Sequence, residues 1–184
     1  MPEETYEREM IRRAQNGDEE AYESLIVSYS PLLFRVVARM ARDPSDAEAI
    51  IQETFWRTWQ SLSRYHNDRP FFPYLASIAV NLFRDQWRKD KWVTSEGLGF
   101  DFELNADSGP DIETLVEERE IRKDLEVAIH QLPPTYRAVI ALRYQGELGY
   151  EEIANILKVP VNTIRTHLHR AKKLLKQQIE KKNG

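Results

Sequence analysis

Apolar residues recur at helical spacing along almost the whole 184-residue chain. A first helix is predicted over about residues 4–15, ending at the turn dipeptide Asn16-Gly17. Asp18 is the predicted N-cap of a second helix, which runs to about Arg42. The apolar positions of the second helix are Ala21, Leu25, Leu32, Leu33, Val36, Val37 and Met40. We therefore expect one face of this helix to lie in a core.

Two further helices complete a predicted first domain of residues 1–91. Ser45 and Glu48 have the spacing of a capping box, which predicts a third helix over about residues 46–64. Its core stripe is Ala47, Ile50, Ile51, Phe55, Trp59 and Leu62. After a polar loop at residues 65–70, a fourth helix is predicted from about residue 71 to residue 91.

Residues 92–111 show no sustained period and contain several glycines and a proline, which is typical of a linker. Four helices are then predicted in a second domain, residues 112–184. They cover about residues 112–131, 135–145, 150–157 and 161–181, with Pro133-Pro134 ending the first of them. The sequence thus predicts an all-α protein of two small helical domains joined by a linker.

Charge is distributed unevenly although the formal net charge is only -4, from 26 Lys and Arg against 30 Asp and Glu. Between Trp92 and Glu118 every charged residue is acidic, whereas residues 161–182 are strongly basic. Such segregation indicates different partners for different segments. The chain has no cysteine, no apolar run near the ~20 residues that span a bilayer, and a polar, acidic start. We therefore expect a cytoplasmic protein that does not insert into a membrane.

The stretch from Tyr150 to Gln177 has the pattern of a helix-turn-helix. Its first helix places Ile153, Ala154 and Leu157 inward, and its second places Ile164, Leu168, Ala171 and Leu175 in one narrow sector. The opposite sector holds Arg165, Thr166, His169, Arg170, Lys173 and Lys176. Arginine can recognise guanine in a bidentate manner, and lysine suits phosphates. The pattern predicts a helix for the DNA major groove, and a solvated basic face on a structural helix is the alternative.

His167 and His169 do not indicate a metal site, because side chains two positions apart on a helix point in clearly different directions. His169 faces the basic surface and His167 lies nearer the core edge. The linear sequence contains no glycine loop for phosphates, no nucleophile motif and no cluster of metal ligands. We therefore expect no catalytic residue, no metal and no cofactor.

Two long runs carry a resemblance to a known family. LPPTYRAVIALRYQGELGYEEIANILKVPVNTIRTHLHRAKKLLK resembles the promoter-binding domain of the extracytoplasmic-function (ECF) sigma factors of bacterial RNA polymerase, in the sigma-70 family. The run from Gly17 to Lys89 resembles their N-terminal domain, and the two runs occur in the family's order. The resemblance implies a promoter-specificity subunit that directs core RNA polymerase to promoters and assists strand opening, with upstream minus-thirty-five recognition by Arg165, Thr166, His169, Arg170 and Lys173.

The resemblance also implies that DAEAIIQETF lies in a helix that docks on the polymerase. The docking candidates, off the core stripe, are Glu48, Gln52, Glu53 and Trp56. An ordinary solvated face is the alternative, and Ala49 stands where the family usually has a second acid.

For YHNDRPFFPYLASIAVNLFRDQWRK the resemblance implies capture of a flipped base of the minus-ten element and binding of the melted strand. The pocket candidates are Tyr65, His66, Asn67, Asp68, Arg69, Phe71 and Asn81. Arg84, Arg88 and Lys91 recur on one face, where they suit phosphates. Core packing is the alternative for at least one of Phe71, Phe72 and Tyr74, and Tyr74 stands where the family commonly has Trp.

The partners implied are core RNA polymerase, promoter DNA and an anti-sigma factor, with a monomeric free chain. The resemblance suggests that the acidic linker threads the polymerase cleft, and a solubilising tether is the alternative. One rival is a helix-turn-helix regulator with an N-terminal sensory domain, which predicts a dimer on a palindrome. A hydrolase using Glu48 and Glu53 is disfavoured, because carboxylates five positions apart on a helix diverge by roughly 140°.

Overall fold

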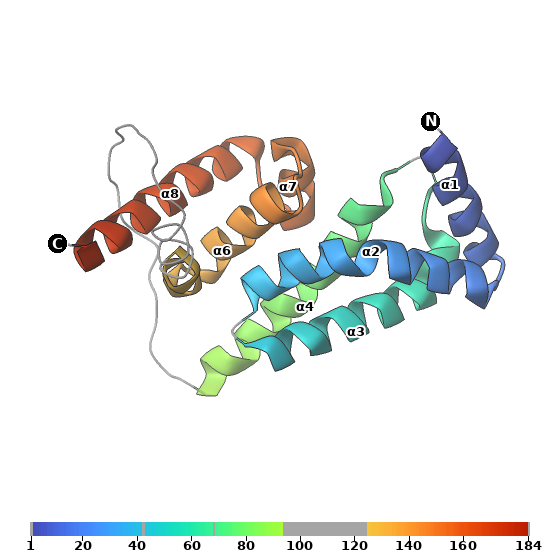
Figure 1. The fold of residues 1–184 in the computed structure, drawn as a ribbon, viewed down its shortest axis with the longest axis horizontal. Coiled ribbons are helices and arrows are strands. Elements are labelled where there is room, and N and C mark those ends of the chain that lie inside the picture. The colour runs from blue at the N-terminus through green and yellow to red at the C-terminus, as the bar shows by residue number, and fades with distance from the viewer. Residues whose placement is uncertain (1, 42, 68, 94–124, 184) are drawn as a thin grey trace.

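The computed structural model describes residues 2–41, 43–67, 69–93 and 125–183 (Figure 1). The first part of the chain forms α1 (Pro2–Gln15), α2 (Glu19–Met40), α3 (Pro44–Ser61) and α4 (Phe71–Val93), with the short 3₁₀ helix η1 (Leu62–Arg64) after α3. The last three α-helices pack against one another, and α1 packs against α2 near one end of this bundle. The four helices predicted here are confirmed, with boundaries shifted by a few residues.

The start of α3 differs from the predicted capping box. The N-cap is Asp43, whose carboxylate accepts a hydrogen bond from the backbone N–H of Asp46 at 2.9 Å. Ser45 instead donates its hydroxyl to the same Asp43 carboxylate at 2.8 Å. Pro44 occupies the first turn, where its missing N–H costs nothing. The prediction that Ser45 and Glu48 cap this helix was wrong, because an aspartate directly before Pro44 competes successfully for the same role.

The core of this bundle follows the predicted stripes, with Tyr22 in α2 and two threonines in α3 as additions. In α2 the buried positions include Leu33, Val36 and Val37, each fully excluded from solvent. In α3, Thr54 and Thr58 are also fully buried, although the apolar pattern did not single them out. Their hydroxyls donate to the carbonyls of Ile50 and Thr54, one turn earlier, so neither buried oxygen lacks a partner.

The second part of the chain is helical at residues 125–131 and then forms α6 (Pro134–Ile140), the π-helical turn η2 (Ala141–Gln145), α7 (Tyr150–Leu157) and α8 (Val161–Asn183). All regular elements of the described residues are helices, which confirms the predicted all-α fold. α8 packs against both α6 and α7 (Figure 1). Apart from residues 92 and 93, which belong to α4, the predicted linker 92–111 lies outside the described residues, as does the start of the second domain at 112.

The turn between α7 and α8 is closed by backbone geometry. Lys158 caps α7 in the left-handed conformation, with φ 56° and ψ 46°. The N–H of Val159 bonds the carbonyl of Ala154, and the carbonyl of Pro160 accepts the N–H of Thr163 at 2.9 Å as α8 begins. This tight turn produces the predicted helix-turn-helix and fixes how the first turn of α8 is presented.

The two helical units are in direct contact, an arrangement that the sequence pattern did not predict. α2 packs against α6 and η2, and α4 packs against α7. At the centre of the contact, a Cβ on Gly146 would lie 3.2 Å from Phe72 and 3.3 Å from Val36, both in the first unit. Glycine at this position permits the close approach of η2 to the first bundle.

The cap of α3 provides a test of this description. We expect Asp43→Ala to lower the midpoint of thermal unfolding by a few degrees and Ser45→Ala to change it much less. The backbone hydrogen bond from Asp46 and the hydroxyl of Ser45 hold the pKa of Asp43 below its ordinary value. A lowered folded-state pKa contributes stability above the unfolded pKa and loses it as pH falls through the folded pKa. The difference in unfolding midpoint between wild type and Asp43→Ala should therefore shrink in strong acid. Equal effects of Asp43→Ala and Ser45→Ala on the midpoint would contradict the assignment of Asp43 as the cap.

Candidate functional site

The helix α8 buries its apolar face and exposes the opposite, basic face to solvent. Ile164, Leu168, Ala171 and Leu175 are all buried, as the helical spacing predicts. Arg165, Thr166 and His169 are exposed, while Arg170 and Lys173 are half-buried. The structure therefore brings the five predicted upstream-DNA residues onto one surface of α8, at and just after the helix-turn-helix turn. Such a surface matches a helix that enters the major groove by its N-terminal part.

Asn162, in the first turn of α8, organises this surface and was not singled out from the sequence. Its side-chain oxygen accepts a hydrogen bond from the Arg165 guanidinium at 3.0 Å, and its backbone carbonyl accepts the Thr166 hydroxyl at 3.0 Å. Asn162 and Arg165 are therefore neighbours on the exposed surface of α8. The i, i+3 spacing of Asn162 and Arg165 was the signal that could have predicted this pair.

His167 has a structural position. Its ring lies against Tyr136 of α6, with centroids 5.3 Å apart, and burial followed by the charge of Arg170 lowers its pKa. His169 is exposed on the basic surface, so the two histidines point apart as predicted. Within the residues that the structure describes, no group of three or more His, Asp or Glu side chains is placed to hold a metal ion.

The loop before α4 is built on an aromatic cluster. Phe71 is 1% exposed and Tyr65 is 8% exposed, and their rings pack edge to face with centroids 5.4 Å apart. Core packing, the alternative considered for Phe71, describes its surroundings, and Phe72 is buried as well. The buried rings of Tyr65 and Phe71 therefore support this loop from the core side. The exposed members of the predicted pocket are His66 and Arg69.

Gln15, at the end of α1, fixes the same loop and was missed by the sequence pattern. Its side-chain amide donates to the carbonyls of Leu62 at 3.0 Å and Tyr65 at 2.7 Å. The Asn67 amide donates to Gln15 at 3.4 Å, whereas the buried side-chain oxygen of Asn67 has no hydrogen-bond partner. Asp68, another predicted member of the pocket, lies outside the described residues. The loop thus contains one buried amide oxygen whose hydrogen-bond capacity is unused.

The basic stripe of α4 is only partly open to solvent. Arg88 is exposed and lies 3.8 Å from the Asp85 carboxylate. Arg84 donates to the backbone carbonyl of Leu157, in α7 of the second unit, at 3.1 Å. Asn81, on the same face, is half-buried, and Lys91 belongs to α4, although its side chain is outside the described residues.

The outer face of α3 carries the four predicted docking residues. Glu48 and Gln52 are exposed, and Trp56 is 57% exposed, which is unusual for so large an apolar side chain. Glu53 forms an ion pair with Arg57 at 2.7 Å. An exposed tryptophan beside acidic and amide groups is typical of a protein-binding surface.

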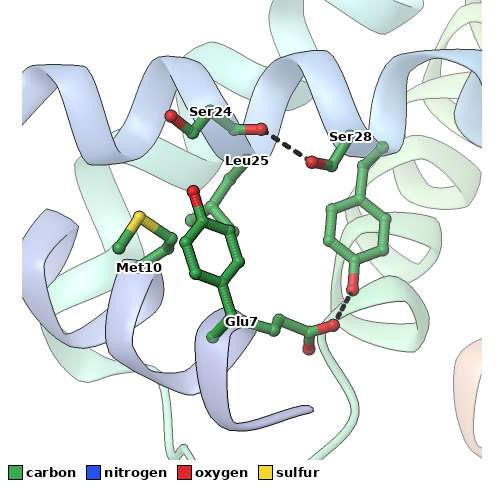
Figure 2. Close-up of a pocket in the computed structure, with 7 residues that line it drawn as sticks. Glu7, Met10, Ser24, Leu25 and Ser28 are labelled. Atoms are coloured by element: carbon green, nitrogen blue, oxygen red, sulfur yellow. Dashed lines mark hydrogen bonds between the residues drawn. The ribbon is translucent and has the colours of Figure 1, made fainter. Parts of the chain in front are cut away.

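A pocket of about 400 Å³ lies elsewhere, between α1 and α2, and is lined by Tyr6, Glu7, Met10, Ser24, Leu25, Ser28 and Tyr29 (Figure 2). Its carboxylate, Glu7, accepts the hydroxyl of Tyr29 at 2.6 Å. Glu48 and Glu53, the carboxylates of the hydrolase alternative, lie on α3 and do not line this pocket. Among the described helices, none has the length and apolarity needed to cross a membrane.

A known family model matches each of the two helical units. The model of sigma-70 region 2 matches residues 25–93, and that of sigma-70 region 4 matches residues 122–175. The chain is 32% identical over 180 residues to the ECF RNA polymerase sigma factor SigW of Bacillus subtilis, covering 94% of this chain and 96% of that protein. It is 30% identical over 190 residues to the ECF RNA polymerase sigma-E factor of Escherichia coli K12, covering 98% and 97% respectively.

Solved structures share the fold. CnrH, in complex with the cytosolic domain of CnrY, aligns with a TM-score of 0.68 at 20% identity, covering 95% of this chain and 97% of that chain. The sigma factor RpoE of Bartonella quintana, in complex with the anti-sigma factor NepR, aligns with a TM-score of 0.65 at 21% identity, covering 86% and 96%.

The chain therefore belongs to the extracytoplasmic-function sigma factors of the sigma-70 family. It is an RNA polymerase sigma factor for promoter-specific initiation of transcription, and such proteins are non-catalytic initiation factors. The rival interpretation of the N-terminal half as a sensory domain is overturned, because that half matches sigma-70 region 2.

Proposed function

We propose that the surfaces described above divide the work of promoter-directed initiation between them. Residues 1–91 act as the module for polymerase docking and the minus-ten element, residues 92–111 as the linker, and residues 112–184 as the module for the minus-thirty-five element. The observation that carries the proposal is Arg165, which is exposed in the second turn of a helix whose other face is buried and which bonds Asn162 of the first turn. Arginine in this position suits bidentate recognition of guanine.

The second part of the proposal concerns strand opening. A base extruded from the minus-ten element contacts four polar side chains: His66, Asn67, Arg69 and Asn81. The buried rings of Tyr65 and Phe71 support the loop from the core side. Extruding a base costs a few kcal/mol, which contacts to its polar edge offset in part. The exposure of His66 and Arg69 supports this, because both side chains can donate hydrogen bonds to the acceptors on a base edge. Arg84, Arg88 and Lys91 bind the phosphates of the melted strand.

The third part concerns protein partners. Glu48, Gln52, Glu53 and Trp56 dock α3 on core RNA polymerase, with Trp56 as the apolar anchor. An anti-sigma factor regulates the chain, in analogy to the sigma factor RpoE, which shares the fold and was solved in complex with the anti-sigma factor NepR. The free chain is a monomer and works in the cytoplasm, where the polymerase is.

Trp56→Ala tests the docking surface. Because Trp56 is largely exposed, the substitution should leave the fold intact while weakening binding to core polymerase by roughly thirtyfold, the effect of losing an anchor of about 2 kcal/mol. Phe34→Ala, at a similarly exposed aromatic position on α2, serves as the control and should not change affinity. Affinity is measured with labelled chain and purified core enzyme. Unchanged binding by Trp56→Ala would remove this residue from the docking surface.

Arg165→Ala tests upstream recognition. With core polymerase present, discrimination of the upstream element should fall by about 1–3 kcal/mol, because a bidentate base contact is lost. Arg165→Lys keeps the charge but not the planar fork, so it should recover general affinity without recovering discrimination. Run-off transcription from promoters with substituted upstream bases measures both. Loss of core binding by Arg165→Ala would contradict the assignment.

Asn81→Ala tests strand opening. We expect it to slow opening of the minus-ten region more than it weakens initial promoter binding, because the amide contacts a base only after extrusion. Arg88→Ala, on the same stripe, should instead lower affinity in a salt-dependent way, since it removes a phosphate contact. Permanganate footprinting follows opening and filter binding follows affinity. Equal losses in both steps for Asn81→Ala would exclude this role.

A further inference from the structure

The backbone of the loop that follows η1 is held in part by its own hydrogen bonds. The N–H of Tyr65 donates to the carbonyl of Leu62 at 3.0 Å. The N–H of Arg69 donates to the carbonyl of His66 at 3.2 Å. The hydroxyl of Tyr65 donates to the carbonyl of Arg69, which ties the far end of the loop to a buried ring. The exposed side chains of His66 and Arg69 therefore project from a segment whose backbone shape is defined.

Gln15 connects this segment to α1 with both donors of one amide. Its Nε2 donates to the carbonyl of Leu62 at 3.0 Å and to that of Tyr65 at 2.7 Å, while its Oε1 accepts the Asn67 amide at 3.4 Å. A primary amide has two N–H donors, so both are used here. Tyr65 is the residue that ends η1, and carbonyls at the end of a helix lack intrahelical partners. Gln15 therefore supplies from another helix the donors that the end of η1 needs.

The position of Gln15 is itself fixed by α1 and by the turn that follows it. Gln15 is the last residue of α1, and Ile11 and Ala14 of the same helix are buried. Beyond the turn, the carboxylate of Asp18, the N-cap of α2, accepts a hydrogen bond from the Arg13 guanidinium at 2.7 Å. The amide is thus presented by a packed helix rather than by the loop that it holds, which is the arrangement that positions a functional group accurately.

We propose that Gln15 is a positioning residue for base selection in the minus-ten element. Its amide holds the carbonyls of Leu62 and Tyr65, and through them it fixes the backbone from which His66 and Arg69 meet an extruded base. This role rests on the base-capture function proposed above. A loop that is ordered in advance loses less conformational entropy when it binds, so its contacts contribute more to affinity.

The role of Gln15 concerns base contacts and not phosphate contacts. Arg84 and Arg88 lie on α4, which is held in the bundle by its own buried side chains, among them Leu75 and Val80. Loosening the loop should therefore lower affinity for the base and leave affinity for the phosphates unchanged. This difference distinguishes a positioning role from a general loss of folded protein.

Two substitutions at Gln15 and one neighbouring control test the role. Gln15→Glu keeps the shape of the side chain but replaces the two donors by a carboxylate, which only accepts. Gln15→Met removes the donors without adding a charge, so agreement between the two variants excludes repulsion of DNA by the new carboxylate. Asn16→Ala is the control, because the exposed Asn16 amide donates to the carbonyl of Arg12 in its own helix at 2.9 Å.

The measurement is the affinity of polymerase holoenzyme, assembled with the full chain, for single-stranded oligonucleotides. They carry the non-template strand of a minus-ten element found by run-off transcription, intact or with one base at a time replaced by an abasic site. At the captured position, wild type should bind the intact strand more tightly than the abasic strand. Gln15→Glu and Gln15→Met should lower this ratio roughly tenfold, the effect of losing two hydrogen bonds, and leave affinity for the abasic strand unchanged. A ratio of two affinities does not depend on the fraction of folded protein.

Unchanged ratios for both Gln15 variants, beside a selective wild type, would overturn the role of Gln15. An equal fall for Asn16→Ala would overturn it too, because the effect would then come from the end of α1. A wild type that selects no base would instead overturn base capture by this loop. Hydrogen exchange of the free chain tests the anchor separately: the Tyr65 and Arg69 amides should exchange roughly tenfold faster in Gln15→Glu. Unchanged exchange at both amides would overturn the anchor.

Discussion

Burial of the apolar stripe of α8 against α6 and α7 decides which of its side chains can meet a ligand. Because Ile164, Leu168 and Ala171 face inward, Arg165 and His169 must face outward. The same constraint operates in α3, where burial of the opposite face leaves its acidic and amide side chains and one tryptophan exposed. Both helices thus bury one face in the core and expose the other.

The charge distribution explains how a chain with a net charge of -4 recognises DNA. Cations are concentrated on α8 and on one stripe of α4, whereas the outer face of α3 carries Glu48 and Glu53. An overall negative charge reduces non-specific attraction to DNA.

Helical spacing was sufficient to predict the fold class and the orientation of α8, because each follows from which positions recur on one face. It could not predict the cap at Asp43, where two adjacent side chains compete, or the burial of Thr58, whose hydroxyl is satisfied only within a formed helix. Gln15 reaches a loop some fifty positions away, which no local pattern encodes. Contact between the units through Gly146 likewise depends on tertiary packing. The roles of the DNA-binding and docking residues came from resemblance together with exposure.

Core-dependent transcription tests the central claim most directly. Purified full-length chain is added to bacterial core RNA polymerase with a library of genomic fragments, and run-off transcripts are mapped. The account predicts transcripts that require both proteins and start downstream of two unlike, regularly spaced elements. Sequence-specific DNA binding by the chain alone, with no transcript and no affinity for core enzyme, would contradict it.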